Sequence, residues 1–246
     1  MKMTIAVAPA SRHDLAMDDL RTLIARLDEW SLLRSFADGE LELLLRTAKR
    51  RDLKRGEDII RQGDEGGFAV ALLSGHLKVS MISPNGREII LAYADPGDVL
   101  GEIALIDKGP RTASVTAIEP AIVLVIPAQA FEAAAMASPQ AMLRMLQVMA
   151  SRIRQLNLMV EGDRAFSAAP RLARVLVRLM DDAGKLRFSP NQSELGAFAG
   201  MARENVNRIL TDWEGSGLLR RSGRALEILD PGYIRELDEF GNPDTV

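Results

Sequence analysis

Residues 101–113 read Gly101-Glu102-Ile103-Ala104-Leu105-Ile106-Asp107-Lys108-Gly109-Pro110-Arg111-Thr112-Ala113. The stretch places a carboxylate, Glu102, and a guanidinium, Arg111, on either side of a turn. A glycine ahead of a short helical segment lets backbone N–H groups approach an anion at the positive end of the helix dipole. Arg111 can bind a phosphate through two parallel hydrogen bonds, and Glu102 can accept hydrogen bonds from ribose hydroxyls. The stretch therefore predicts a receptor for a small cyclic phosphate; a surface turn with a Glu–Arg pair is the alternative.

The residues around this stretch predict a small antiparallel β domain. From Leu53 to about Pro127, short apolar runs of β type alternate with glycine-rich turn residues, which is typical of a barrel or jelly roll. Asn85-Gly86 between two such runs predicts a hairpin, because both residues tolerate positive φ. Ahead of this domain, residues 15–50 carry apolar positions at helical spacing, and Asp38 is the expected N-cap of the second helix.

After Pro139 the chain becomes helical. Apolar residues recur there at intervals of three and four: Met142, Met145, Met149, Ile153, Leu156 and Val160. Such a stripe is typical of a coiled-coil seam, although a core helix inside one subunit has the same pattern. Interleaved arginines favour a partly exposed helix that pairs with its twin in a dimer, and Gly162-Asp163 predicts the break in this pattern.

The C-terminal segment carries a local positive charge. Between Arg164 and Leu229, arginine and lysine outnumber acidic residues, whereas the whole chain has a net charge of −3. Local positive charge suits a polyanion. Asn191-Gln192-Ser193-Glu194 predicts a capped helix start, Gly200-Met201-Ala202 predicts a turn, and a second helix is expected from Arg203. This is the spacing of a helix-turn-helix.

The second of these helices has two different faces. At 100° per residue, Val206, Ile209, Leu210 and Trp213 form the buried side. The opposite side can read a major groove, because arginine binds guanine O6 and N7 and glutamate accepts from cytosine N4. An ordinary surface pair between Glu204 and Arg208 is the alternative. The groove-facing set is Arg203, Glu204, Asn207 and Arg208.

Two motifs in the same order resemble one family. The first stretch is similar to the phosphate-binding cassette of cyclic-nucleotide-binding domains, matching at Gly101, Glu102, Ala104, Leu105, Pro110, Arg111 and Ala113. The second resembles the recognition helix, Arg-Glu-x-Val-x-Arg, of the cyclic-AMP receptor protein and fumarate-nitrate regulator (Crp/Fnr) superfamily, at residues 203–208. Residues 218–229, with the basic turn Arg221-Ser222-Gly223-Arg224, look like that family's wing.

The resemblance spans about residues 30–231 and implies an α+β fold. Its parts would be an N-terminal helical extension (1–28), a cyclic-nucleotide-binding β-roll of jelly-roll type (29–137), a long dimerisation helix (138–163) and a C-terminal winged helix-turn-helix (164–246). The family implies a homodimeric, cytoplasmic transcription regulator. Its partners would be double-stranded DNA with a TGTGA-like palindrome and RNA polymerase.

The resemblance also assigns residues. Ligand contacts would be Gly101, Glu102, Ile103, Ala104, Arg111, Thr112 and Asn157, and DNA contacts would be Ser193, Arg203, Glu204, Asn207, Arg208 and Arg224. The cyclic-AMP receptor type carries a threonine-serine pair that contacts adenine, and these positions fall on Leu156-Asn157 here. Leucine offers no hydrogen-bonding group, so cyclic AMP and cyclic GMP both stay open as effectors. Ala202 stands where the family often has a capping serine.

The composition narrows the remaining classes. The absence of cysteine excludes disulfides, thiolate metal sites and iron-sulfur clusters, and two scattered histidines, His13 and His76, suggest neither haem nor metal; His76 is expected as a half-exposed strand residue. No apolar run approaches the ~20 residues of a membrane span. A family regulator with another ligand or none, and a cyclic-nucleotide-binding regulatory subunit of an enzyme, remain as alternatives. No catalytic residue is expected.

Overall fold

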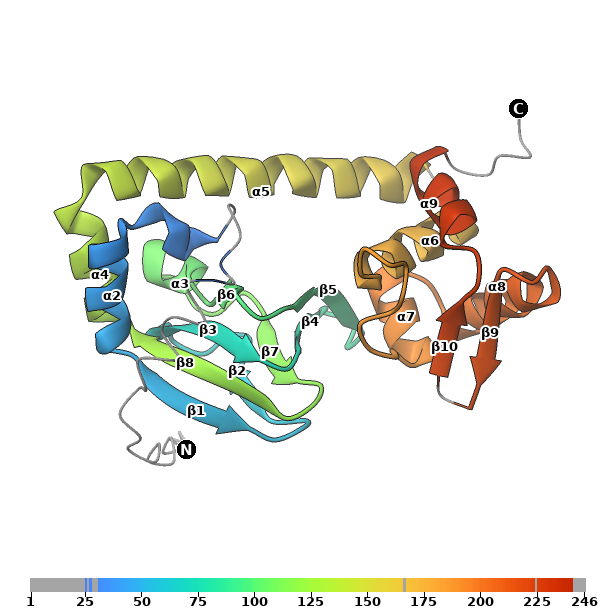
Figure 1. The fold of residues 1–246 in the computed structure, drawn as a ribbon, viewed down its shortest axis with the longest axis horizontal. Helices are drawn as coiled ribbons and strands as arrows, with labels where there is room; N and C mark the ends of the chain where they lie inside the picture. Colours follow the sequence, from blue (N-terminus) through green and yellow to red (C-terminus); the bar gives the residue numbers. More distant parts are fainter. Residues whose placement is uncertain (1–24, 26, 28–30, 166, 224, 241–246) are drawn as a thin grey trace. The chain divides into compact units, whose positions relative to one another are not determined.

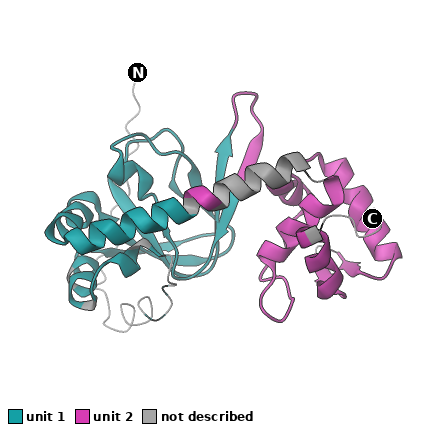
Figure 2. Cartoon of the chain, turned by 90° about the horizontal axis from the view of Figure 1, so that it is seen from above, with its two compact units in different colours: residues 1–82, 91–152 teal, residues 83–90, 153–246 magenta. Residues whose placement is uncertain are grey.

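The computed structural model describes residues 25, 27, 31–165, 167–223 and 225–240 of the 246-residue chain. The chain divides into two units, residues 1–82 with 91–152 and residues 83–90 with 153–246 (Figure 2). The first unit holds two β-sheets and several helices, and the second holds a helix-turn-helix with a β-hairpin (Figure 1). The α+β fold predicted from the sequence is confirmed.

The first unit is built on two four-stranded sheets. One has the strand order β1 (Lys49–Leu53), β8 (Ala121–Pro127), β3 (Phe68–Ser74) and β6 (Val99–Leu100). The other has the order β2 (Asp58–Ile60), β7 (Ser114–Ala117), β4 (Leu77–Ile82) and β5 (Glu88–Ala94). The registered pairs within both sheets are antiparallel.

Strand β3 shows why its sequence is apolar without alternation. Successive side chains of a strand point to opposite faces of a sheet. Val70 and Leu72 join a core with residues of the second sheet such as Leu77 and Val115. Ala69, Ala71 and Leu73 join the other core, under the helices. Both faces of this strand are therefore buried.

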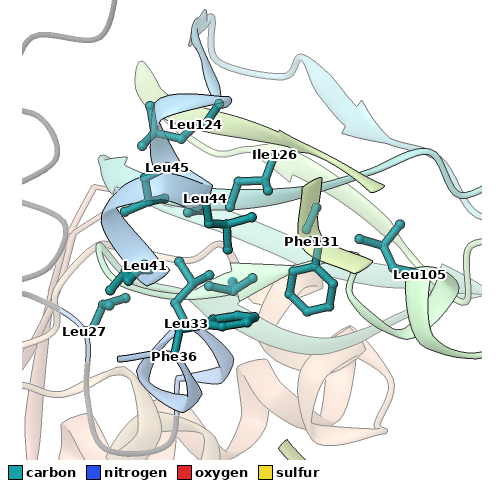
Figure 3. Close-up of a cluster of buried hydrophobic side chains, with 14 of the residues drawn as sticks. Leu27, Leu33, Phe36, Leu41, Leu44, Leu45, Leu105, Leu124, Ile126 and Phe131 are labelled. Atoms are coloured by element: carbon teal, nitrogen blue, oxygen red, sulfur yellow. The ribbon is translucent and has the colours of Figure 1, made fainter. Parts of the chain in front are cut away.

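Helices cover the outer face of the first sheet. They are the 3-10 helix η1 (Leu32–Ser35), α2 (Asp38–Arg46), α4 (Ala128–Ala137) and the start of α5. Their apolar side chains point toward those of β8, and the rings of Phe36 and Phe131 meet edge-on at 5.9 Å (Figure 3). The predicted N-cap of α2 is wrong by one residue: Ala37 precedes the helix, and its N–H donates to the Glu40 carboxylate at 3.0 Å.

Two turns differ in detail from their predictions. The hairpin at Asn85-Gly86 is confirmed, with the Ser83 N–H donating to the Arg87 carbonyl oxygen at 2.9 Å, but only Gly86 has positive φ. His76 lies in the turn between β3 and β4 rather than in a strand. Its Nδ1 lies 2.6 Å from the Glu119 carboxylate, because the neighbouring turns bring acidic side chains to this end of the sheets.

Helix α5 (Pro139–Ala165) begins after Ser138, whose hydroxyl accepts from the Ala141 N–H at 3.2 Å, with proline in the first turn. The predicted break at Gly162-Asp163 is wrong, because the helix continues to Ala165. A glycine inside a helix costs only about 1 kcal/mol relative to alanine, which is not enough to end the helix.

The predicted apolar seam of α5 is split between two faces. Met145 and Met149 pack against the core of the first unit and leave no seam at these positions. Among the side chains of this helix that the structure describes, the large exposed apolar ones are Met142, Leu143, Leu146 and Ile153, at 46%, 51%, 66% and 59% exposure. The side chains of Leu156 and Val160 lie outside the described part of the structure. A single periodic stripe in the sequence thus contains residues of two packing surfaces.

The second unit contains α6 (Ala168–Leu179), α7 (Gln192–Ala199), α8 (Arg203–Gly215), the hairpin of β9 (Leu219–Ser222) and β10 (Ala225–Ile228), and α9 (Pro231–Phe240). Helix α6 packs on α7, α8 and α9. Its Arg174 donates to Asp238 of α9 at 2.9 Å. In the described portion of the chain, no helix has the length and apolar character needed to cross a membrane.

Candidate ligand and nucleic-acid sites

The turn at Gly101 favours glycine for two reasons. Gly101 has φ +82°, and a Cβ atom there would lie 2.6 Å from Nη1 of Arg111 and 2.7 Å from Cδ1 of Ile60. A side chain at this position would therefore be strained by the backbone conformation, and it would force Arg111 and Ile60 to shift. The short helix α3 (Ile103–Ile106) follows, with Glu102 as its N-cap residue.

Arg111 is fixed against the backbone on one side of this turn. Its Nη1 donates to the Gly101 carbonyl oxygen at 2.7 Å, and its Nη2 donates to the Phe68 carbonyl oxygen at 2.6 Å. The guanidinium carbon lies 4.7 Å from the centroid of the Phe68 ring, which adds a cation–π contact. A guanidinium has five N–H groups, so these two bonds leave three donors for a ligand.

Two charged side chains are buried together here. Glu102 and Arg111 are each 4% exposed. Burial lowers the pKa of Arg111, while the negative charges of Glu102 and Asp64 act in the opposite direction. Arginine stays protonated in proteins because its ordinary pKa is so high. A buried charge is costly without a partner of opposite charge. The Glu102 carboxylate and the Arg111 guanidinium offset each other's burial at this turn.

The remaining predicted ligand residues differ in exposure. Ala104 is buried. A Cβ added to Gly66 would lie 2.6 Å from the Cβ of Ala104, so the loop that contains Gly66 packs closely on α3. Ile103 is 42% exposed and Thr112 is exposed. The side chain of Asn157 lies outside the described part of the structure.

The structure thus brings Gly101, Glu102 and Arg111 together at one turn. Sequence reasoning missed Phe68 and Asp64, whose contacts with Arg111 come from positions more than forty residues away along the chain. No local pattern marks such contacts. Across the described ranges, no group of three or more His, Cys, Asp or Glu side chains is placed to hold a metal ion.

The helix-turn-helix forms as the sequence predicts. The Asn191 side chain accepts from the Ser193 and Glu194 N–H groups at 2.9 and 3.0 Å, and the Glu194 carboxylate accepts from the Asn191 N–H at 2.9 Å. Gly200, at φ +64°, ends α7. A Cβ on Gly196 would lie 2.7 Å from the Met201 carbonyl oxygen, so this glycine lets the turn approach α7 closely.

Helix α8 has the two predicted faces. Val206, Ile209, Leu210 and Trp213 are buried, whereas Arg203, Glu204, Asn207 and Arg208 are exposed. Within the part of the chain that the structure describes, no ion pair joins Glu204 to Arg208. Ala202 precedes the helix without a side-chain hydrogen bond. Ser193 lies exposed in the first turn of α7.

The wing is attached to α8 through Arg221 of β9. Its backbone N–H donates to the Glu214 carboxylate at 3.0 Å, and its Nε and Nη2 donate to the same carboxylate at 2.8 and 2.6 Å. Its Nη2 and Nη1 also lie 3.2 Å from the Thr211 hydroxyl and the Asn207 side-chain oxygen. The hydrogen bonds from Arg221 lower the pKa of Glu214.

These contacts were not predicted, because they join a strand to the preceding helix. The sequence places Arg221 only in a basic turn. Arg224, which the sequence also assigns to the wing, lies outside the described residues. Arg220 is exposed and donates to Glu227 of β10 at 3.2 Å.

Comparisons with known proteins cover both sites. Residues 50–138 match the model of the cyclic nucleotide-binding domain, and residues 170–237 match that of the Crp-like helix-turn-helix domain. The chain is 30% identical over 187 residues to the CRP-like cAMP-activated global transcriptional regulator of Mycobacterium tuberculosis, covering 73% of this chain and 83% of that protein. It is 30% identical over 200 residues to the transcriptional activator protein Anr of Pseudomonas protegens, with 78% and 82% covered. The solved structure of FixK2 from Bradyrhizobium japonicum has the same fold, with a TM-score of 0.68, 22% identity, and 78% of this chain and 97% of that chain covered.

Proposed function

The chain belongs to the Crp/Fnr superfamily of DNA-binding transcription regulators, and we propose that it is a homodimer whose DNA affinity is set by cyclic AMP or cyclic GMP. Residues 29–137 would sense the nucleotide, residues 138–163, which include most of α5, would dimerise, and residues 164–246 would bind DNA. The segment 1–28 would be an N-terminal extension. As a regulator of transcription, the protein would act in the cytoplasm.

The observation that carries this proposal is the buried pair of Glu102 and Arg111 at the Gly101 turn. A cyclic nucleotide presents one negative phosphate and one free ribose hydroxyl. Arg111 would donate its remaining N–H groups to the phosphate, and Glu102 would accept from the hydroxyl. The N–H groups of Ile103 and Ala104 would add donors at the start of α3. These roles are those of ligand contacts rather than of catalysts.

The choice of base depends on other residues. Thr112 follows Arg111 and is exposed, so its hydroxyl can accept from the amino group of guanine. Asn157 of α5 can both donate to a base and accept from it. One relative is named as cAMP-activated, and we infer that this protein binds both nucleotides.

Dimerisation would use the outer face of α5. Leu143, Leu146, Ala150 and Ile153 are exposed and recur at intervals of three, four and three residues. This heptad spacing is typical of two helices that pack side by side. A two-fold dimer presents two copies of α8, as a palindromic site requires.

DNA recognition would lie on α8 and its neighbours. Arg203 and Arg208 would bind guanines, and Glu204 would accept from cytosine, which suits TGTGA-like half-sites. Asn207 would contact a further base, while Ser193 and Arg224 would contact phosphates. A relative named as a transcriptional activator supports RNA polymerase as a further partner.

Fluorescence anisotropy tests the DNA half of this proposal. Full-length protein should bind a labelled TGTGA palindrome more tightly than a scrambled duplex of the same length. Replacing Arg203 or Arg208 with alanine should cost ~1–3 kcal/mol on the palindrome and leave binding to the scrambled duplex nearly unchanged. Equal losses on both duplexes would remove the assignment of these arginines to bases.

A regulator that needs no nucleotide is the second candidate. The observation in its favour is that Arg111 already donates to two backbone carbonyl oxygens and stacks on Phe68. In that case the Arg111 guanidinium stabilises the turn and binds no ligand. Such a protein would bind the palindrome equally well with and without nucleotide.

A further inference from the structure

Asn207 of the recognition helix takes part in a hydrogen-bond network that joins three elements. Its side-chain oxygen accepts from Nε2 of Gln192, in the first turn of α7, at 3.1 Å. The same oxygen accepts from Nη1 of Arg221, in strand β9, at 3.2 Å. The α7 helix, the recognition helix and the wing therefore meet at one carboxamide oxygen.

This network fixes which way the Asn207 carboxamide points. Arg221 has only N–H donors to offer, so the atom of Asn207 that faces it must be the oxygen. A carboxamide oxygen has two lone pairs, and Gln192 and Arg221 occupy both. The group that Asn207 has left to present is its NH2, a donor of hydrogen bonds.

The position of Arg221 is itself fixed. Its Nε and Nη2 donate to the Glu214 carboxylate, and Nη2 also lies 3.2 Å from the Thr211 hydroxyl. Its guanidinium therefore has a carboxylate partner within the protein. Such a paired arginine is a weak ligand for a DNA phosphate, unlike an arginine at the tip of a wing.

We propose that Arg221 is a specificity-determining positioning residue that holds Asn207 as a hydrogen-bond donor toward the major groove. A donor is matched best by guanine, with its O6 and N7 acceptors, and by a single acceptor on thymine (O4) or adenine (N7). Cytosine presents a donor there and is rejected. Adenine is normally bound by asparagine through both amide atoms, and this mode is closed because the oxygen is occupied. The inference rests on the proposed function of α8 in reading DNA.

Selection from randomised double-stranded DNA tests this inference with the full-length protein. The base pair read by Asn207 is the one whose preference disappears in Asn207→Ala. We expect wild-type protein to favour guanine there and to disfavour cytosine, each by about two- to tenfold relative to adenine, the effect of one hydrogen bond. Asn207→Asp can still accept from Gln192 and Arg221 but presents an acceptor, so it should favour cytosine or adenine instead.

Arg221→Met tests the positioning role directly. It keeps an unbranched apolar stem, frees the Asn207 oxygen and should raise the preference for adenine at the same base pair, because both amide atoms can then bind that base. The slope of log affinity against log salt should stay unchanged, whereas loss of a phosphate contact lowers it by about 0.9. Arg220→Met is the matched control, because Arg220 is the exposed neighbour that pairs with Glu227, and it should leave the base preference unaltered.

Three results would overturn the inference. One is a lower salt slope for Arg221→Met with an unchanged base preference, which makes Arg221 a phosphate contact. Another is an Asn207→Asp preference identical to that of the wild type, a result that does not depend on how well the Arg221 variant folds. In both cases wild-type protein still selects a site, so the proposed function stands. Selection of no sequence by wild-type protein would overturn both.

Discussion

The Nη1 group of Arg111 donates to the carbonyl oxygen of Gly101 over 2.7 Å, although the two residues lie on opposite sides of α3 in the sequence. The same nitrogen lies where a side chain on Gly101 would have to go. The position of the Arg111 guanidinium therefore depends on the absence of a side chain at Gly101. A change at either residue should alter the ligand site.

Gly101→Ala should abolish nucleotide binding and destabilise the fold. The added Cβ would displace Arg111, and a positive φ costs an alanine about 1–2 kcal/mol. Gly86→Ala is the control, since Gly86 has nearly the same φ, +79°, but open space around its Cβ position. Calorimetric titration should show binding by Gly86→Ala and none by Gly101→Ala. Equal binding by both variants would contradict this account of the turn.

Thr112→Ala should weaken cyclic GMP and leave cyclic AMP nearly unaffected. The loss should be about 0.5–1.5 kcal/mol, the value of one neutral hydrogen bond. Wild-type protein should bind the two nucleotides within about a hundredfold of each other, since each base gains or loses only a few such bonds. Glu102→Ala should weaken both, because it removes a contact to the shared ribose. Calorimetry measures all three, and a loss of both nucleotides in Thr112→Ala would place Thr112 at the phosphate.

Leu146→Glu should split the dimer without unfolding the protomer. Leu146 is 66% exposed on the outer face of α5, whereas Met149 packs on the core. Met149→Glu should instead destabilise the fold, because it places a charge against the apolar core on which the partly buried Met149 packs. Light scattering and thermal unfolding separate the two effects. Met136→Glu, at an exposed methionine of α4, should change neither; a dimer that survives Leu146→Glu would rule out this seam.

The contact between Glu214 and Arg221 should depend on pH. Hydrogen bonds from Arg221 hold the pKa of Glu214 below its ordinary value of 4.5. The stabilisation is therefore fully present above pH 4.5 and is lost as the pH falls through the lowered pKa. Glu214→Gln should have a lower free energy of unfolding than the wild type at neutral pH. This difference between the two proteins should disappear in acid, where Glu214 of the wild type is protonated. Glu227→Gln, which removes an exposed pair with Arg220, should matter less; an acid-independent difference for Glu214→Gln would disprove the linkage.

Features set by neighbouring residues could be predicted from the sequence. The capping box of Asn191 and Glu194, the left-handed Gly200 and the start of α8 at Arg203 each depend on a few adjacent residues. The Gly101 turn and the buried face of α8 belong to the same group. Local hydrogen bonding and helical periodicity are sufficient to specify them.

Features that depend on residues far apart in the chain could not be predicted from the sequence. Met149 satisfies the spacing of a dimer seam as well as that of a core helix, and only the folded structure shows that it packs against the core of the first unit. Phe68 reaches Arg111 because β3 passes beside the turn. In the sequence Arg221 cannot be told apart from the other basic residues of the wing. Only strand β9 places its guanidinium against the Glu214 carboxylate. In each case the missing information is which surfaces meet.

We propose that a cyclic nucleotide bound at the Gly101 turn controls the affinity of this protein for DNA. The most direct test is the anisotropy titration of a TGTGA palindrome with wild-type protein and Arg111→Ala, each without nucleotide and with saturating cyclic AMP or cyclic GMP. Coupling between two sites in one protein is typically about 1–3 kcal/mol, or about 5- to 150-fold in affinity. We expect at least one nucleotide to tighten wild-type binding by such a factor, and we expect Arg111→Ala to show no response. Wild-type affinity that is the same under all three conditions would contradict this proposal.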